Sequence, residues 1–195
     1  MGRLVTVNPC PFFLSMTTFI ETYSDVLQRK TCRTLVEWFE NNQNFHEKQE
    51  LGYKKSTDAL MLLESNAYPS RVIMKCIFDC LVKYKQKYEV MDSMPHKWSL
   101  VNSYRIQRYY PNEGFSEKHF EHSPTNYPNR MMVWMLYLNT VRDGGTRFPQ
   151  HDLTVEADEG KMVLWPAYWT HVHHGIVSST ETKYIATGWF EFIKE

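Results

Sequence analysis

The sequence predicts an α+β fold, in which helices of the first half cover one sheet of a closed or double-sheet β-structure. Two observations lead to this fold class. Apolar residues recur at helical spacing over 22–45 and again over 69–90. After Trp98 the chain changes to short segments of β-branched and aromatic residues, separated by turns rich in Pro, Gly and Asn.

The first half of the chain is expected to hold two helices. Over 22–45 the apolar residues follow mixed spacings of three and four, and Ser24 is a candidate N-cap. Over 69–90 one helical face is marked more sharply, with Pro69 at its start. The residues on this face are Ile73, Cys76, Ile77, Cys80, Leu81, Tyr84 and Tyr88. The segment MDSMP at 91–95 then breaks the helix.

Strands are expected throughout the second half. The five expected strands are 100–110, 131–139, 153–157, 161–165 and 183–192. A chain of 195 residues can bury a core without disulfides or a structural metal. We therefore expect one domain over 1–195, with a helical N-terminal part at about 1–95 and a β-structure at about 96–195.

The charge of the protein is balanced, with 22 Lys and Arg against 22 Asp and Glu, which argues against a broad nucleic-acid-binding surface. No run of about 18 or more uncharged apolar residues is present, so no membrane span is expected. The N-terminal segment MGRLVTVNPCPFFLSMTTFIETY is broken by two prolines and is a poor signal peptide. We expect a cytoplasmic protein with reduced cysteines at Cys10, Cys32, Cys76 and Cys80.

Histidines and a carboxylate recur at spacings that suit a metal site. His119 and Glu121 are two residues apart, and residues i and i+2 of a strand point to the same face. About fifty residues later, the segment WTHVHHG places His171 and His173 on one face and His174 on the other. Two imidazoles and one carboxylate leave open positions on a non-haem Fe(II) ion, although these residues alone would suit zinc equally well.

Lys183 favours iron over zinc, and a dicarboxylic 2-oxo acid as the second ligand of the site. It lies ten residues beyond His173, at the start of the segment KYIATGWF. A lysine inside a barrel needs an anionic partner, because burying an unpaired ammonium is costly. A dicarboxylic 2-oxo acid would meet both needs, since its oxo-acid end can chelate iron while its far carboxylate pairs with Lys183. A lysine on the exposed face of its strand would carry no such role.

From about Arg105 to Phe192 the chain resembles the Fe(II)- and 2-oxoglutarate-dependent dioxygenases of the prolyl 4-hydroxylase type. The matching segments occur in order and are YYPNEGFSEKHFE, RMMVWMLYLN, DGGTRFP, GKMVLWPAYWTHVHHG and KYIATGW. Together they span nearly half of the chain, whereas residues 1–95 resemble the family only loosely. The resemblance implies a double-stranded β-helix, the cupin-like jelly roll, which agrees with the strands expected above.

The resemblance also implies which residues bind the metal. The family's HxD motif falls on His119 and Glu121, so that glutamate replaces the more usual aspartate. The family's distal histidine lies ten residues before its lysine, which favours His173 over His171 as the third ligand. His171 would then be a neighbour of the site and His174 a rim residue. The expected metal ligands and catalytic residues are therefore His119, Glu121 and His173.

Further residues match the co-substrate and substrate positions of the family. The residues assigned to 2-oxoglutarate are Lys183, Tyr110, Tyr137, Thr146 and Trp189. Arg130 matches the family's substrate-side arginine. At Ser116, three residues before the first ligand, relatives that act on peptidyl proline often have tyrosine. The co-substrate residues are thus matched completely and the substrate surface only in part.

The resemblance implies an enzyme that hydroxylates an unactivated C–H with Fe(II), 2-oxoglutarate and O2, with ascorbate as a candidate further cofactor. Proline in a peptide or protein is the expected substrate, and neither nucleic acid nor a membrane is an expected partner. The residue at Ser116 keeps open the same chemistry on a free amino acid, another side chain or a small metabolite. A non-catalytic, metal-binding jelly roll that serves as an interaction module is a further alternative, but it would have no need of Lys183 or Tyr110.

Overall fold

The computed structural model describes residues 17–65 and 67–193, so the expectations for the first sixteen residues and for Cys10 lie outside these ranges. Within them the chain forms two α-helices, α1 (Arg29–Asn41) and α2 (Tyr68–Lys87), and two β-sheets. Short 3-10 helices lie at Gln43–Phe45, Glu89–Asp92, Pro149–His151 and Trp169–His171. No helix of the described ranges is long and apolar enough to cross a membrane.

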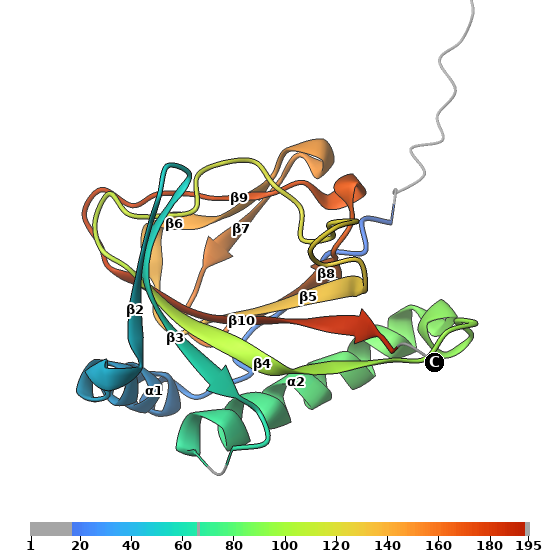
Figure 1. The fold of residues 1–195 in the computed structure, drawn as a ribbon, viewed down its shortest axis with the longest axis horizontal. Helices are drawn as coiled ribbons and strands as arrows, with labels where there is room; N and C mark the ends of the chain where they lie inside the picture. Colours follow the sequence, from blue (N-terminus) through green and yellow to red (C-terminus); the bar gives the residue numbers. More distant parts are fainter. Residues whose placement is uncertain (1–16, 66, 194–195) are drawn as a thin grey trace, which may run out of the picture.

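The larger sheet has seven strands in the order β1-β8-β5-β10-β4-β3-β2 (Figure 1). Its strands are β1 (Glu21–Tyr23), β2 (His46–Leu51), β3 (Lys54–Leu62), β4 (Trp98–Tyr109), β5 (Arg130–Tyr137), β8 (Met162–Pro166) and β10 (Lys183–Phe192). The smaller sheet has the order β7-β6-β9 and comprises β6 (Val141–Phe148), β7 (Leu153–Ala157) and β9 (His174–Gly175). All neighbouring strands are antiparallel. The smaller sheet lies over one face of the larger sheet, and α1 and α2 cover the other face, as the predicted jelly roll requires (Figure 1).

Strand β5 shows how the larger sheet serves two cores. Trp134 and Leu136 join the core that the two helices cover, whereas the alternate residues Met135 and Tyr137 join a second core between the sheets. Successive side chains of a strand point to opposite faces. Full burial of each large apolar side chain stabilises the fold by about 1.5–3 kcal/mol. A strand buried on both faces is therefore apolar over most of its length, as β5 is after Arg130.

Helix α2 begins at the expected place, with Pro69 in its first turn, where a missing N–H costs nothing. Helix α1 begins only at Arg29, after Gln28 in an extended conformation, so the predicted N-cap at Ser24 is wrong. The reason is that β1 first pairs with β8, and the chain then turns through Asp25, which has a φ of 55°. Among the described residues, the three cysteines are buried and free of disulfides, as expected.

The part of the chain expected to be helical, about 1–95, also contains three strands of the larger sheet. The sequence does not mark β3, because its residues 56–59 are all buried and the alternation of a half-buried strand is absent. All five strands predicted in the second half are confirmed, as β4, β5, β7, β8 and β10. The hairpin formed by β2 and β3 extends the larger sheet beside the mouth of the site described next.

Candidate active site

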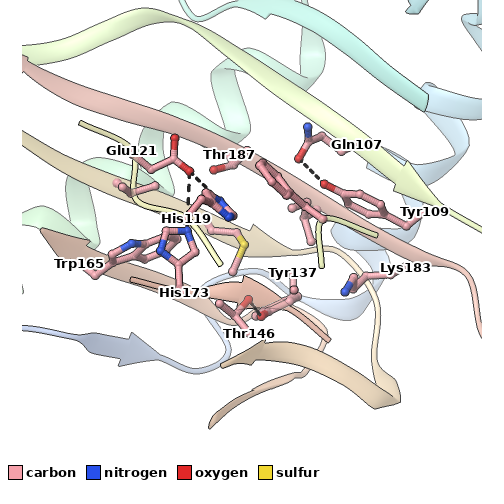
Figure 2. A pocket seen from close by; sticks show the side chains of 15 residues that line it. Gln107, Tyr109, His119, Glu121, Tyr137, Thr146, Trp165, His173, Lys183 and Thr187 are labelled. Carbon is pink, nitrogen blue, oxygen red and sulfur yellow. Dashed lines mark hydrogen bonds and ion pairs between the residues drawn. The ribbon is translucent and has the colours of Figure 1, made fainter. Parts of the chain in front are cut away.

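A cavity lies between the two sheets (Figure 2). Its lining residues are Gln107, Tyr109, Phe115, His119, Glu121, Val133, Met135, Tyr137, Thr146, Trp165, His173, Gly175, Lys183, Ile185 and Thr187. The two histidines and the glutamate stand at one end, and Lys183, Tyr137 and Thr146 stand at the other (Figure 2). One cavity thus joins the two groups of residues that the sequence singles out.

Backbone pairing brings the metal-binding segments together. His119 and His173 exchange two backbone hydrogen bonds of 2.9 Å as an isolated antiparallel bridge. The Glu121 N–H donates to the Ala167 carbonyl at 3.0 Å. The segment 119–121 therefore lies outside the strands of both sheets, contrary to expectation, yet this pairing still presents both of its ligands to the cavity.

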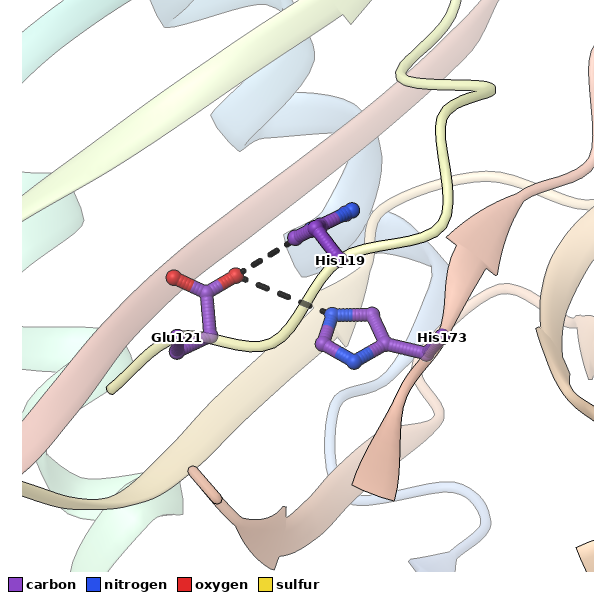
Figure 3. Close-up of side chains that lie close together, drawn as sticks. All are labelled: His119, Glu121 and His173. Carbon is purple, nitrogen blue, oxygen red and sulfur yellow. Dashed lines mark ion pairs between the residues drawn. The ribbon is translucent and has the colours of Figure 1, made fainter. Parts of the chain in front are cut away.

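The three side chains converge on one point (Figure 3). Glu121 Oε1 lies 3.4 Å from His119 Nε2 and 3.6 Å from His173 Nε2, and the three potential ligand atoms are all within 4.8 Å of one another. The Nδ1 atom of His119 lies 2.8 Å from the Glu117 carbonyl, and that of His173 lies 2.9 Å from the His171 carbonyl. Since a carbonyl oxygen only accepts, each Nδ1 carries a proton, and each Nε2, which faces Glu121, is the atom available to a metal.

Aromatic rings hold both imidazoles in place. Phe115 stacks on His119, with 3.7 Å between ring centroids and 6° between ring planes. Phe148 and Trp165 pack against His173 at centroid distances of 5.5 and 5.1 Å. The ligand rings therefore have little rotational freedom left to lose when a metal binds.

The donor set suits Fe(II). Burial opposes ionisation of Glu121, but the facing His119 and His173 outweigh it and hold the pKa of this carboxyl well below its usual range. The site thus offers one hard oxygen and two imidazole nitrogens from one side. Two histidines and one carboxylate form the facial triad of non-haem Fe(II) oxygenases, which leaves open positions on the ion for further ligands.

The other end of the cavity suits an anion. Lys183 is only 5% exposed, and its ammonium donates one hydrogen bond, to the Ile176 carbonyl at 2.8 Å. Within the described ranges its other N–H groups therefore remain available to a ligand. The Tyr137 hydroxyl and Thr146 Oγ1 lie 2.8 Å apart in the same part of the cavity (Figure 2). A carboxylate fits these converging donors.

Binding of a dicarboxylate at Lys183 should weaken as the pH rises through about 8. Burial lowers the pKa of Lys183 to about 8, although the charge of Asp143 opposes the shift. Above that pH the free protein holds a neutral amine, so anion binding must take up a proton. The Kd should then rise by up to about tenfold per pH unit. Calorimetric titration of 2-oxoglutarate into the Mn(II)-loaded protein at several pH values measures this dependence.

The matched control for this pH dependence is Lys183→Arg, because a guanidinium stays charged over the whole range. Its Kd for 2-oxoglutarate should not change through the same pH interval. A wild-type protein with an equally flat profile would show that the ammonium of Lys183 does not meet the ligand.

The tyrosine that lines the cavity is Tyr109, and the assignment of Tyr110 to this position is corrected. Tyr109 is 5% exposed, and its ring centroid lies 5.5 Å from Lys183 Nζ. Tyr110 is 46% exposed, outside the cavity, with the guanidinium of Arg108 4.2 Å from its ring centroid. Tyr109 and Lys183 are direct partners of the β4–β10 register and therefore share a face. Along β4, Ile106 faces the helices, so Tyr109, three residues later, lies on the opposite face.

A buried chain of polar groups holds Tyr109. Its hydroxyl donates to Gln107 Oε1, and Gln107 Nε2 donates to Asp58 Oδ2, both at 2.9 Å. Asp58 is fully buried and also accepts from Lys54 Nζ and Ser56 Oγ, at 2.7 Å each. Sequence reasoning missed Gln107 and Asp58, because only the β3–β4 pairing brings them to the site.

Two further assignments change. Trp189, expected at the co-substrate, is absent from the cavity lining and lies in a groove at its mouth, where its Nε1 donates to Glu121 Oε2 at 3.1 Å. Arg130, expected on the substrate side, lines neither the cavity nor the groove, and its Nη1 donates to the same Oε2 at 3.1 Å. Both residues thus contact a metal ligand and lie outside the space for a co-substrate, and Trp189 also lines the groove.

The other two histidines of this segment, His171 and His174, have hydrogen-bond partners outside the metal site. His171 Nε2 lies 2.7 Å from the Thr18 carbonyl, and its Nδ1 lies 2.9 Å from Thr170 Oγ1. Burial lowers the pKa of His171, although the hydrogen bond with the Thr18 carbonyl opposes this shift. His174 lies on β9, and its Nδ1 is 3.4 Å from the Gly175 carbonyl. Of the three histidines in this segment, only His173 reaches the triad.

Comparison with known proteins agrees with this geometry. Residues 104–191 match the model of the 2OG-Fe(II) oxygenase superfamily. Among curated proteins, none matches the chain. The matched segment runs from β4 to β10 and contains all three members of the triad and Lys183.

Solved structures of prolyl hydroxylases share the fold. The viral collagen prolyl hydroxylase of Paramecium Bursaria Chlorella virus-1, in its 2OG complex, matches with a TM-score of 0.69 at 16% identity, over 90% of this chain and 97% of that one. A Pseudomonas putida prolyl-4-hydroxylase gives 0.69 at 17% identity, over 91% and 95%. A Trichoplax adhaerens prolyl hydroxylase, in complex with a hypoxia inducible factor oxygen degradation domain peptide fragment, gives 0.66 at 11% identity, over 90% and 84%. Residues 104–191 thus match the 2OG-Fe(II) oxygenase superfamily, the chain has the fold of the prolyl hydroxylases, and together with the triad these matches support a 2-oxoglutarate-dependent dioxygenase with Fe(II) and 2-oxoglutarate as its cofactors.

Proposed function

We propose that this dioxygenase hydroxylates a prolyl residue within a peptide or protein. The observation that carries the proposal is an open groove that runs past the metal-binding residues and shares His119 and Glu121 with the cavity. A peptide continues on both sides of the residue that reacts, and such a chain needs an open groove rather than a closed pocket. A segment lying in this groove would present one side chain to the triad.

The groove is lined by large aromatic side chains, which are Tyr53, Phe115, Phe120, Tyr127 and Trp189. They come from the β2–β3 hairpin, from the loop between β4 and β5, and from β10. Several of these rings are exposed to solvent. Exposed apolar side chains gathered in one place mark a binding surface.

Proline-rich segments suit a surface of this kind. They hold the polyproline II conformation before binding, so they lose little entropy when they bind, and they dock in aromatic-lined grooves. The Trichoplax adhaerens prolyl hydroxylase, which shares the fold, is in complex with a peptide fragment. That complex supports a peptide as the class of substrate.

Different residues of the chain would have different roles in the reaction. The triad would hold Fe(II), which when bound supplies the activation of O2. Lys183, with Tyr137 and Thr146 beside it, would bind the far carboxylate of 2-oxoglutarate and so direct its oxo-acid end toward the triad. The buried cavity excludes water, and the groove positions the C–H to be oxidised. One oxygen atom of O2 enters the substrate as a hydroxyl, and the other enters succinate as 2-oxoglutarate loses carbon dioxide.

Mass spectrometry of proline-containing peptides tests the proposal. Peptides incubated with the protein, Fe(II), 2-oxoglutarate and air should gain one oxygen, located on proline by fragmentation. Peptides with alanine in place of each proline should stay unmodified. Oxygen gain on free proline or on a small metabolite, but on no peptide, would contradict the proposal and favour the alternative substrate class.

A matched pair of variants tests whether the peptide binds in the groove. Phe120→Ala removes an aromatic side chain that is 42% exposed in the groove and should raise the KM for the peptide by roughly fivefold or more. Phe78→Ala removes one that is 48% exposed on α2, across the larger sheet, and should leave this KM unchanged. Equal KM values for both variants would place the peptide elsewhere.

A further inference from the structure

Arg130 is buried next to the metal-binding carboxylate. Its guanidinium lies between the rings of Tyr127 and Trp189, 3.6 Å from each ring centroid. Only 9% of the residue is exposed. Because rings cover both faces of the guanidinium, only its edge is available for hydrogen bonds, and its position is closely defined.

That edge meets Glu121. Arg130 Nη1 donates to Glu121 Oε2 at 3.1 Å and to the backbone carbonyl of Glu121 at 3.4 Å. Trp189 Nε1 donates to the same Oε2, also at 3.1 Å. The other oxygen, Oε1, faces the two histidines of the triad, while Oε2 points away from them (Figure 3). The two oxygens of one carboxylate are thus divided between the metal site and two fixed donors.

A glutamate needs this restraint more than an aspartate would. Its extra methylene adds a rotatable torsion between the backbone and the carboxylate. A carboxylate that is free to turn can bind a metal through both of its oxygens. The second oxygen would then fill one of the open positions that 2-oxoglutarate and O2 require. Two donors held at Oε2 oppose that rotation.

We propose that Arg130 and Trp189 are positioning residues, which keep Glu121 as a ligand through Oε1 alone and so preserve an open position on the metal. The inference rests on the metal site and not on the identity of the substrate. It is therefore tested without any peptide, and its failure would not contradict the proposed prolyl hydroxylation. It also explains why this arginine is buried behind the groove and not exposed within it.

The number of water molecules on bound Mn(II) tests the inference. With the site saturated by Mn(II) and without 2-oxoglutarate, the relaxation rate of water protons per bound ion is proportional to the exchangeable waters on that ion. In Arg130→Gln the released oxygen should fill one open position and lower this rate by roughly one third. Trp189→Phe keeps a ring over the guanidinium but removes the N–H, and it should lower the rate by a smaller amount.

Glu191→Gln is the matched control. Glu191 Oε1 lies 3.8 Å from Arg130 Nε, so this change removes another charge next to the arginine and leaves both donors to Oε2 in place. Its relaxation rate per ion should equal that of the wild type. Wild-type rates in both Arg130→Gln and Trp189→Phe would overturn the proposal. If Arg130→Gln does not fold, the result for Trp189→Phe decides, because its ring preserves the packing around the guanidinium.

Discussion

The His173→Ala variant should bind Fe(II) or Mn(II) more than about 100-fold more weakly than the wild type and should show no measurable turnover of 2-oxoglutarate. The substitution removes one of the three donors that converge within 4.8 Å, and His119 and Glu121 alone offer too few ligands to hold the ion against water. His173 is buried, and Phe148 and Trp165 pack against its ring. Calorimetric metal titration and the release of labelled carbon dioxide from 2-oxoglutarate measure the two effects.

The control for this loss is His171→Gln, two residues away. Both ring nitrogens of His171 already have partners, the Thr18 carbonyl and Thr170 Oγ1. A glutamine amide can replace one of these hydrogen bonds, so the variant should lose about 1 kcal/mol of stability and keep its metal. An active His173→Ala enzyme together with an inactive His171→Gln enzyme would move the third ligand to His171.

The Lys183→Ala variant should need at least about 30-fold more 2-oxoglutarate for half-maximal turnover, because losing one partner of a buried charge pair costs about 2–5 kcal/mol of binding free energy. Lys183 brings a positive charge to its end of the cavity, where the hydroxyls of Tyr137 and Thr146 supply only neutral hydrogen bonds. Metal affinity should not change, since the ammonium lies at the opposite end from the triad (Figure 2). The KM for 2-oxoglutarate and the Kd for Mn(II), measured on the same preparation, separate these effects.

Two comparisons make the lysine test specific. Lys183→Arg keeps the charge and should recover much of the lost affinity for 2-oxoglutarate. A 2-oxo acid that lacks the far carboxylate should bind wild type and Lys183→Ala about equally well. Thermal unfolding should change little, because the substitution removes a buried ammonium whose desolvation already lowers its pKa to about 8. A wild-type KM in Lys183→Ala would mean that the carboxylate binds elsewhere.

Two spacings within the site were predictable because they are local. His119 and Glu121 are two residues apart, so any extended backbone places them on one side. The nine residues between His173 and Lys183 span the short β9 and the turn into β10. The five strands of the second half were predictable for the same reason, since each is a short apolar segment bounded by turn residues.

Register is where prediction from spacing failed. Tyr109 and Tyr110 are adjacent in the sequence, and counting back from the first ligand selected the wrong one. In the structure β4 ends at Tyr109, which pairs with Lys183, while Tyr110 turns outward against Arg108. A shift of one residue moves a strand's side chain to the opposite face, so only the pairing of β4 with β10 decides which tyrosine lines the cavity.

By itself, the sequence determined the α+β class, the strands of the second half, the two histidines and the glutamate that can bind a metal, and the lysine that can meet a dicarboxylate. The tertiary structure decided that Asp58 reaches the site through Gln107, that Tyr109 replaces Tyr110, and that Arg130 holds Glu121. The physical reason is the range of the interactions. Side-chain chemistry and periodicity act over a few residues, whereas strand register, burial and contacts between distant segments exist only once the chain has packed.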